Sequence, residues 1–182
     1  MVYCSLLSFF ELHFTGHNAF AVRELDLQFF PEEGRAEMVK NADHVTLVVR
    51  DVEAAKKFFA LLGFKDEIDT VISGEPLSTY MGIKNIESRH ITLVLQGGTP
   101  RFEIQLLHYM NPPVLKDPNT TDLHRTGYNH LALRVEDIDS EVKRLKEAGV
   151  VIKNQPVAFH NRKLVFLVGP EDVTIELVEW LD

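Results

Sequence analysis

The feature that most constrains the fold is an internal repeat. Residues 44–63 and residues 130–149 align without a gap, each copy running from a histidine to a glycine. In both copies an alternating apolar segment is followed by a helical apolar stripe, which predicts a strand, a tight turn and a helix. Asp51 and Asp137 each lie seven residues after the histidine, where they are expected to cap the helices. The chain is therefore expected to contain two equivalent modules.

Three strand-like segments follow the helix in each copy. They cover residues 65–72, 91–95 and 102–109 in the first copy, and residues 151–154, 164–168 and 173–180 in the second. The extra residues of the first copy lie in the connection from Ser73 to Arg89, which is rich in turn formers. The sequence thus predicts an α+β fold of two tandem βαβββ modules. Their expected bounds are residues 39–112 and 127–182, with a linker over residues 113–126.

Residues 1–38 stand outside the repeat and are interpreted as an N-terminal extension. Six of the twelve phenylalanines lie in its first thirty residues, and its first basic residue is Arg23, which does not fit a secretory signal. Either the extension packs its aromatic residues on the main domain or on a partner chain, or it is translated upstream sequence. We favour the second interpretation, with Met38 as the natural start, because a strand is predicted six residues later.

Charge and composition exclude several classes of partner. The chain has 27 acidic and 19 basic residues, a net charge of -8, whereas a nucleic-acid binder needs a basic face. The same balance argues against adsorption to anionic membranes. No apolar run approaches the roughly 18 residues of a membrane-spanning helix. The single cysteine, Cys4, cannot form an internal disulfide, so we expect a cytoplasmic protein.

Four polar side chains fall at equivalent positions of the two copies. Because alternate residues of a strand face opposite ways, His44 and His130 should point away from the helices. Gln105 and Glu176 should do the same in the closing strands. If the modules turn these faces toward each other as a curved mixed sheet, the four side chains meet in a cleft. Two imidazoles, a carboxylate and an amide oxygen would suit a divalent transition metal.

Residues 40–182 resemble the vicinal oxygen chelate superfamily, which includes glyoxalase I, methylmalonyl-CoA epimerase, extradiol dioxygenases and bleomycin-resistance proteins. The strongest likeness lies in Gly127–Asp139, which reads GYNHLALRVEDID, and in Thr174–Val178, which reads TIELV. The resemblance implies one divalent ion (Zn, Co, Ni, Mn or Fe) and a small-molecule substrate with metal-chelating oxygens. It implies that the metal ligands are His44, Gln105, His130 and Glu176. We also expect a homodimer, because open sheet edges invite a second chain, with modules paired within or between chains.

The order His, Gln, His, Glu is most similar to that of methylmalonyl-CoA epimerase, which implies proton transfer next to a carbonyl. The position of the epimerase base holds Thr92 in this chain, and threonine cannot take up a proton. Glu176 and Glu103 are therefore the candidate catalytic bases.

Three alternatives remain open. A lactoylglutathione lyase of the glyoxalase I type is the first, although its glutathione-contacting positions hold Val48 and Tyr109 here. An extradiol-type dioxygenase would use His44, His130 and Glu176 to hold Fe(II). A non-catalytic resistance protein that binds a small molecule is the third.

Overall fold

The structure, a computed structural model, describes residues 39–181, so the N-terminal extension interpreted from the sequence lies outside the described residues. The chain from Asn41 onward forms one compact unit. The elements of its first module are β1 (His44–Val48), α1 (Val52–Leu61), β2 (Phe64–Ser73), α2 (Leu77–Met81), β3 (Glu87–Leu95) and β4 (Glu103–Asn111). Those of the second are β5 (His130–Arg134), α3 (Ile138–Glu147), β6 (Val157–Phe159), β7 (Arg162–Val168), the short 3-10 helix η2 (Pro170–Asp172) and β8 (Thr174–Trp180).

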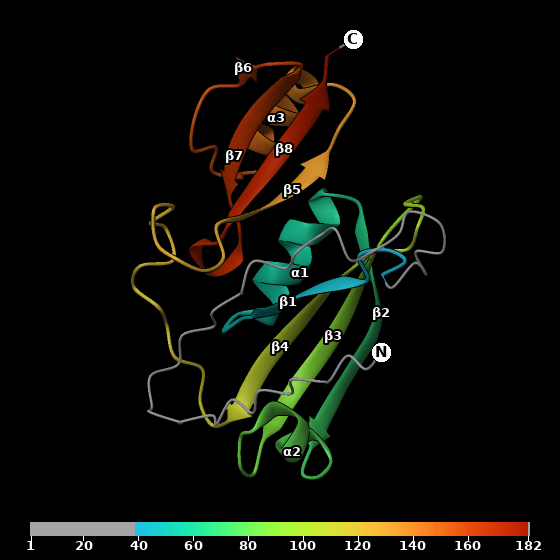
Figure 1. Ribbon diagram of the computed structural model, residues 1–182, viewed down its shortest axis with the longest axis vertical. Coiled ribbons are helices and arrows are strands. Elements are labelled where there is room, and N and C mark those ends of the chain that lie inside the picture. The colour runs from blue at the N-terminus through green and yellow to red at the C-terminus, as the bar shows by residue number, and fades with distance from the viewer. Residues whose placement is uncertain (1–38, 182) are drawn as a thin grey trace, which may run out of the picture. The chain divides into compact units, whose positions relative to one another are not determined.

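The two modules have the same topology, as the repeat predicts (Figure 1). Each forms a four-stranded mixed sheet, in the orders β1-β4-β3-β2 and β5-β8-β7-β6. The first strand of each module is parallel to the last, and the other neighbouring strands are antiparallel. The predicted α+β fold of two tandem βαβββ modules is confirmed. The two sheets are separate within the chain, so β1 and β5 are both edge strands.

The residues that the repeat singled out define the helix ends. Asp51 Oδ1 accepts a hydrogen bond from Ala54 N at 2.9 Å, and Asp137 Oδ1 accepts one from Ser140 N at 3.0 Å. Each bond satisfies an amide of the first helical turn that has no partner inside the helix. Gly63 follows α1 with φ of +86°, a left-handed conformation that a residue with a Cβ rarely adopts.

The helix-facing sides of both sheets share one hydrophobic core. Phe59 of α1 and Leu145 of α3 are fully buried in it, together with Ile104, Leu106 and Ile175 of the closing strands. Polar contacts also join the modules. Arg50 donates to the Glu171 carboxylate from its backbone N at 2.6 Å and from Nε at 2.7 Å. Since the helix sides face this shared core, the opposite face of each sheet lies outside it.

The structure differs from two sequence expectations. The strand predicted over residues 151–154 is only an isolated bridge at Ile152, and the outer strand is β6 instead. Next to this bridge, the side chain of Asn154 accepts the hydrogen bond of Phe166 N. This side-chain bond ends the backbone hydrogen bonding between residues 151–154 and β7. The connection after Ser73 contains the helix α2, where only turns were expected.

The described linker, between β4 and β5, has neither helix nor strand. No helix within residues 39–181 is long and apolar enough to cross a membrane.

Candidate metal site

The second module brings two of the predicted ligands together. His130 is the first residue of β5, and Glu176 lies in the middle of the adjacent strand β8. His130 Nε2 is 3.4 Å from Glu176 Oε2. Two ligands held at about 2.1 Å from one ion in tetrahedral geometry are about 3.4 Å apart, so the observed spacing fits a shared metal. Glu176 is buried on this face, and the Phe166 ring lies 5.3 Å from the imidazole ring.

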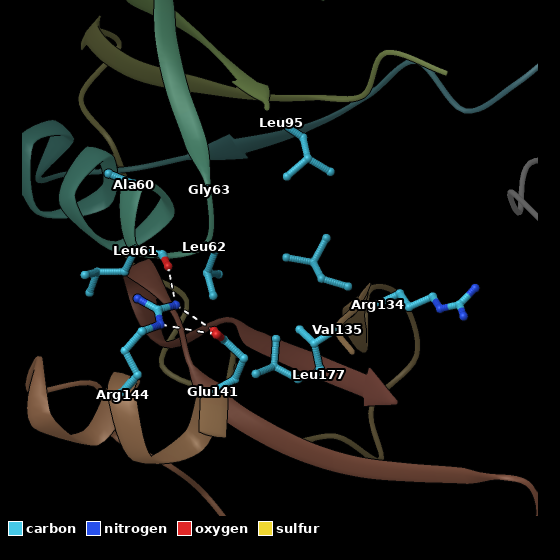
Figure 2. A pocket seen from close by; sticks show the side chains of 11 residues that line it. Ala60, Leu61, Leu62, Gly63, Leu95, Arg134, Val135, Glu141, Arg144 and Leu177 are labelled. Atoms are coloured by element: carbon cyan, nitrogen blue, oxygen red, sulfur yellow. Dashed lines mark hydrogen bonds and ion pairs between the residues drawn. The ribbon is translucent and has the colours of Figure 1, made fainter. Parts of the chain in front are cut away.

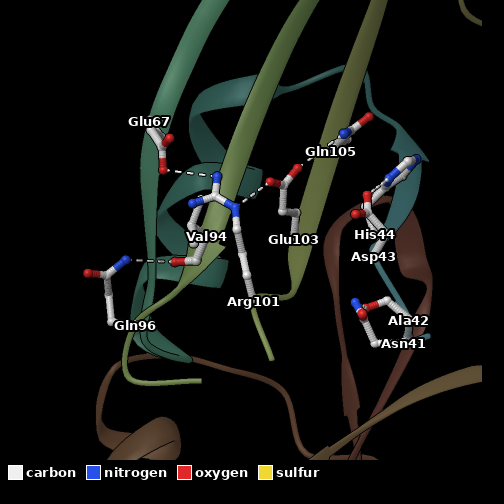
Figure 3. A network of polar contacts seen from close by, with 10 residues as sticks. All are labelled: Asn41, Ala42, Asp43, His44, Glu67, Val94, Gln96, Arg101, Glu103 and Gln105. Carbon is white, nitrogen blue, oxygen red and sulfur yellow. Dashed lines mark hydrogen bonds and ion pairs between the residues drawn. The ribbon is translucent and has the colours of Figure 1, made fainter. Parts of the chain in front are cut away.

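Both candidate histidines are oriented by the residue that precedes them. His44 Nδ1 lies 2.7 Å from Asp43 Oδ1 (Figure 3), and His130 Nδ1 lies 2.7 Å from Asn129 Oδ1. A side-chain oxygen of an ionised Asp or of Asn can only accept a hydrogen bond, so Nδ1 is the donor. In the neutral ring this leaves Nε2 unprotonated and free to bind a metal. The equivalent arrangement occurs in both modules.

Gln105 is oriented by a second polar contact in the first module. Its Nε2 donates a hydrogen bond to Glu103 Oε2 at 3.2 Å (Figure 3). This bond uses the amide nitrogen and not the amide oxygen, which is the atom that would bind a metal. Arg101 Nε in turn donates to Glu103 Oε1 at 2.7 Å. The hydrogen bond from Arg101 holds the pKa of the Glu103 carboxyl below its usual value. Glu103 is thus a weaker base than a free carboxylate.

The two pairs remain apart within the chain. Among residues 39–181, no group of three or more histidine, cysteine, aspartate or glutamate side chains is placed to hold one metal ion. His44 therefore does not join His130 and Glu176 in a single copy. The physical reason is the shared core, because all four candidate ligands lie on the faces that point away from it. Each module carries a half-site of suitable chemistry: one imidazole and one side-chain oxygen.

A separate hollow of about 380 Å³ lies where the modules meet (Figure 2). Five of its eleven lining residues are leucines, and none of the candidate ligands lines it. Its Arg144 is engaged by Glu141 at 2.6 Å and by the backbone oxygen of Leu61 at 2.7 Å.

Sequence reasoning missed Asp43, Asn129 and Arg101 as functional candidates. A signal for the first two was present, because the repeat extends one residue further back with Asp43 and Asn129 at matching positions. Arg101 carried no such signal, since its role depends on the turn that joins β3 to β4. Thr92, at the expected base position, is paired with Gln105 across the sheet and is buried.

Known proteins share this fold. A glyoxalase family protein from Bacillus cereus is 28% identical, with a TM-score of 0.69 over 79% of this chain and 96% of that chain. The antibiotic-binding protein TnmS3 from a Streptomyces species is 21% identical, with a TM-score of 0.53 over 79% and 98%. The fosfomycin resistance protein FosX from Listeria monocytogenes, complexed with Mn(II) and sulfate ion, is 16% identical, with a TM-score of 0.50 over 79% and 94%.

No match was found among the curated proteins. The profile of one family matches residues 43–166, which include both candidate histidines and the helices α1, α2 and α3. That match covers well over half of the chain, and the predicted kinship is confirmed. The chain belongs to the Glyoxalase/Bleomycin resistance protein/Dioxygenase superfamily.

Proposed function

We propose that the protein is a divalent-metal-dependent enzyme that transfers a proton next to a carbonyl group, as an epimerase or isomerase does. The observation that carries this proposal is the contact between His130 Nε2 and Glu176 Oε2 at 3.4 Å. Asn129 holds the other ring nitrogen, so the imidazole presents its basic nitrogen toward the carboxylate. The FosX structure is complexed with Mn(II), which supports a divalent metal as the cofactor.

We propose further that two copies of the chain complete each site. His44 and Gln105 of one copy would then join His130 and Glu176 of a second copy. Three findings support this. The four residues lie outside the shared core, and His44, His130 and Glu176 form no group of three within residues 39–181. In addition, β1 and β5 are edge strands of their sheets. A two-fold symmetric dimer would contain two such sites.

The ligand set indicates the chemistry. Two neutral imidazoles, a neutral amide and one carboxylate would leave a divalent ion with a net positive charge, which stabilises an oxyanion formed beside a carbonyl. Glu176 is the proposed proton acceptor. Glu103 is less suited to that task, because Arg101 and Gln105 both donate to its carboxylate and its pKa is lowered. We assign Glu103 the role of orienting Gln105.

A small-molecule-binding protein without catalysis is the second candidate. It is favoured by Thr92, which is buried at the expected base position and cannot accept a proton. A lactoylglutathione lyase and an extradiol-type dioxygenase complete the alternatives, and substrate assays separate all of them.

The first test is metal content. Purified full-length protein should hold about one divalent ion per chain, since a symmetric dimer has two sites. Glu176→Ala should hold far less. Glu147→Ala, which removes an exposed carboxylate from α3, is the matched control and should behave as wild type. Equal metal content in wild type and Glu176→Ala would contradict the proposed site.

The second test is the reaction. Metal-loaded protein is incubated in D2O with methylmalonyl-CoA, with methylglyoxal plus glutathione, and with a catechol under O2. Deuterium at the α-carbon of the acyl-CoA supports proton transfer. Lactoylglutathione or ring cleavage would assign the protein to the lyases or the dioxygenases, and no turnover of any substrate would favour the binding protein.

A further inference from the structure

An apolar pocket of about 180 Å³ adjoins the His130–Glu176 pair on the second sheet. Glu176 forms part of its wall, and Val157, Phe159, Leu164 and Phe166 supply its apolar surface. Volumes of 300 to 1,000 Å³ are typical for sites that enclose a complete drug-sized ligand. The pocket is therefore suited to one substituent of a ligand.

The strand register explains why the pocket and the candidate ligands meet. Phe166 of β7 pairs with Glu176 of β8, and Leu164 pairs with Val157 of β6. Residues two apart on a strand share a face, so these side chains belong to the face that carries Glu176. Phe166 also packs against the His130 ring. One bound molecule can thus contact the pocket and the proposed metal ligands together.

The polar atoms around the pocket are nearly all engaged. Asn154 Oδ1 accepts from Phe166 N at 2.9 Å, and Asn154 Nδ2 donates to Gln155 O at 2.7 Å. Glu176 is the other polar side chain of the lining. Val157 and Phe159 remain 53% and 60% exposed, so apolar surface next to the candidate metal site is in contact with water. A partner for this surface has to be apolar.

We infer that the pocket binds an aryl or branched alkyl group of the substrate. The substrate class is then a small molecule whose vicinal oxygens chelate the metal and whose adjoining carbon carries an apolar group of about benzene size. The size follows from precedent, since an apolar protein cavity of about 150 Å³ accommodates benzene. This inference rests on the proposed function, because the proposed metal ion binds the chelating oxygens of the substrate.

Two hydroxamates with the same chelating group provide the first test. Acetohydroxamate carries a methyl group and benzohydroxamate a phenyl group, and both are titrated into the full-length protein loaded with Co(II). Benzohydroxamate should bind at least about tenfold more tightly, because the phenyl group leaves water. Val157→Ser and Phe159→Ser should reduce this ratio to about threefold or less. Neither should change the affinity for acetohydroxamate.

Val151→Ser is the matched control, because Val151 is 62% exposed and does not line the pocket. It should keep the wild-type ratio of the two affinities. Equal affinities for the two hydroxamates in wild type, or a ratio that survives both pocket substitutions, would overturn the inference. A ratio unchanged by Val157→Ser and Phe159→Ser, together with a weakened dimer, would identify the pocket as part of a subunit interface and also overturn it.

A metal-free experiment separates failure of the pocket from failure of the metal site. Toluene is added to the protein without metal, and the methyl resonances of Val157 and Leu164 are followed by NMR. Shifts of these methyls, with Val151 unaffected, would support the pocket even if no metal or hydroxamate bound. The absence of shifts at Val157 and Leu164 would overturn it independently of the metal.

Discussion

Asp43→Ala should weaken metal binding without changing the fold. Asp43 Oδ1 accepts the only side-chain hydrogen bond found for the His44 ring within residues 39–181, at 2.7 Å. Its side chain is 81% exposed, so its removal leaves no cavity. Loss of a residue that orients a metal-binding histidine typically reduces metal affinity by about 10- to 100-fold. Because solvent competes for an exposed bond, we expect the lower end, about tenfold, or about 1.4 kcal/mol.

The repeat supplies the matched variant. Asp43→Asn copies the second module, where Asn129 Oδ1 accepts from His130 Nδ1 at the same distance of 2.7 Å. It should keep the metal affinity within about threefold of wild type, since the acceptor remains. Asn41→Ala removes a nearby side chain whose one hydrogen bond within residues 39–181 goes to Ala42 O, and it serves as the control.

The assay is competition for Zn(II) or Co(II) against a chromophoric chelator, with the thermal midpoint recorded for each variant. NMR of the metal-free protein near pH 8.5 reads the ring directly, and His44 should carry its proton on Nδ1 in wild type. Equal affinity of Asp43→Ala and wild type would refute the reasoning. So would a proton on His44 Nε2 in the wild-type protein.

Three further predictions concern stability. Leu145→Ala should lower the free energy of unfolding by about 2.7–5 kcal/mol in urea titrations, because this fully buried side chain leaves a cavity, whereas Val151→Ala should change it by under about 0.5 kcal/mol. Partial burial raises the pKa of Glu171, but hydrogen bonds from Arg50 outweigh it and hold that pKa below its usual value. This stabilisation is complete above the unfolded pKa of about 4.3 and is lost as the pH falls through the lower folded pKa. Arg50→Ala removes the side-chain bond and keeps the backbone bond, so it should partly flatten the loss of stability between about pH 5 and pH 3. An unchanged slope would count against a contribution from the Arg50 side chain. Removing the metal with a chelator should lower the thermal midpoint of the wild-type protein. When free metal starts at about 100 times its Kd, the lost stabilisation is about 2.7 kcal/mol. The midpoint of Glu176→Ala should not change.

Local patterns made much of the fold predictable. Alternation placed Leu47 and Val49 in the core and His44 on the opposite face, and the repeat carried this assignment to the second module. The caps at Asp51 and Asp137 followed from their position before an apolar stripe. Such features depend on residues that are close in sequence. The same pattern in both copies of the repeat therefore strengthened each prediction.

Other features depend on contacts between residues far apart in the sequence, and these could not be predicted from local patterns. The outer strand of the second module was misplaced, because the side chain of Asn154 takes a backbone hydrogen bond that a strand would otherwise use. Glu103 was expected as a possible base, whereas Arg101 from the preceding turn engages it. Whether the two half-sites meet in one copy depends on how the modules pack. That packing is decided by the shared core around Phe59 and Leu145, and no local pattern encodes it.

A subunit-mixing experiment tests most directly whether two copies complete the metal site. His44→Ala and Glu176→Ala each damage both sites of a dimer and should bind metal weakly when purified alone. When the two are co-expressed and assemble at random, half of the dimers contain one copy of each. Each mixed dimer then has one intact and one doubly damaged site, so about a quarter of all sites should bind metal with wild-type affinity. Metal binding by the mixture no greater than that of the separate variants, with dimers present, would contradict a site shared between copies.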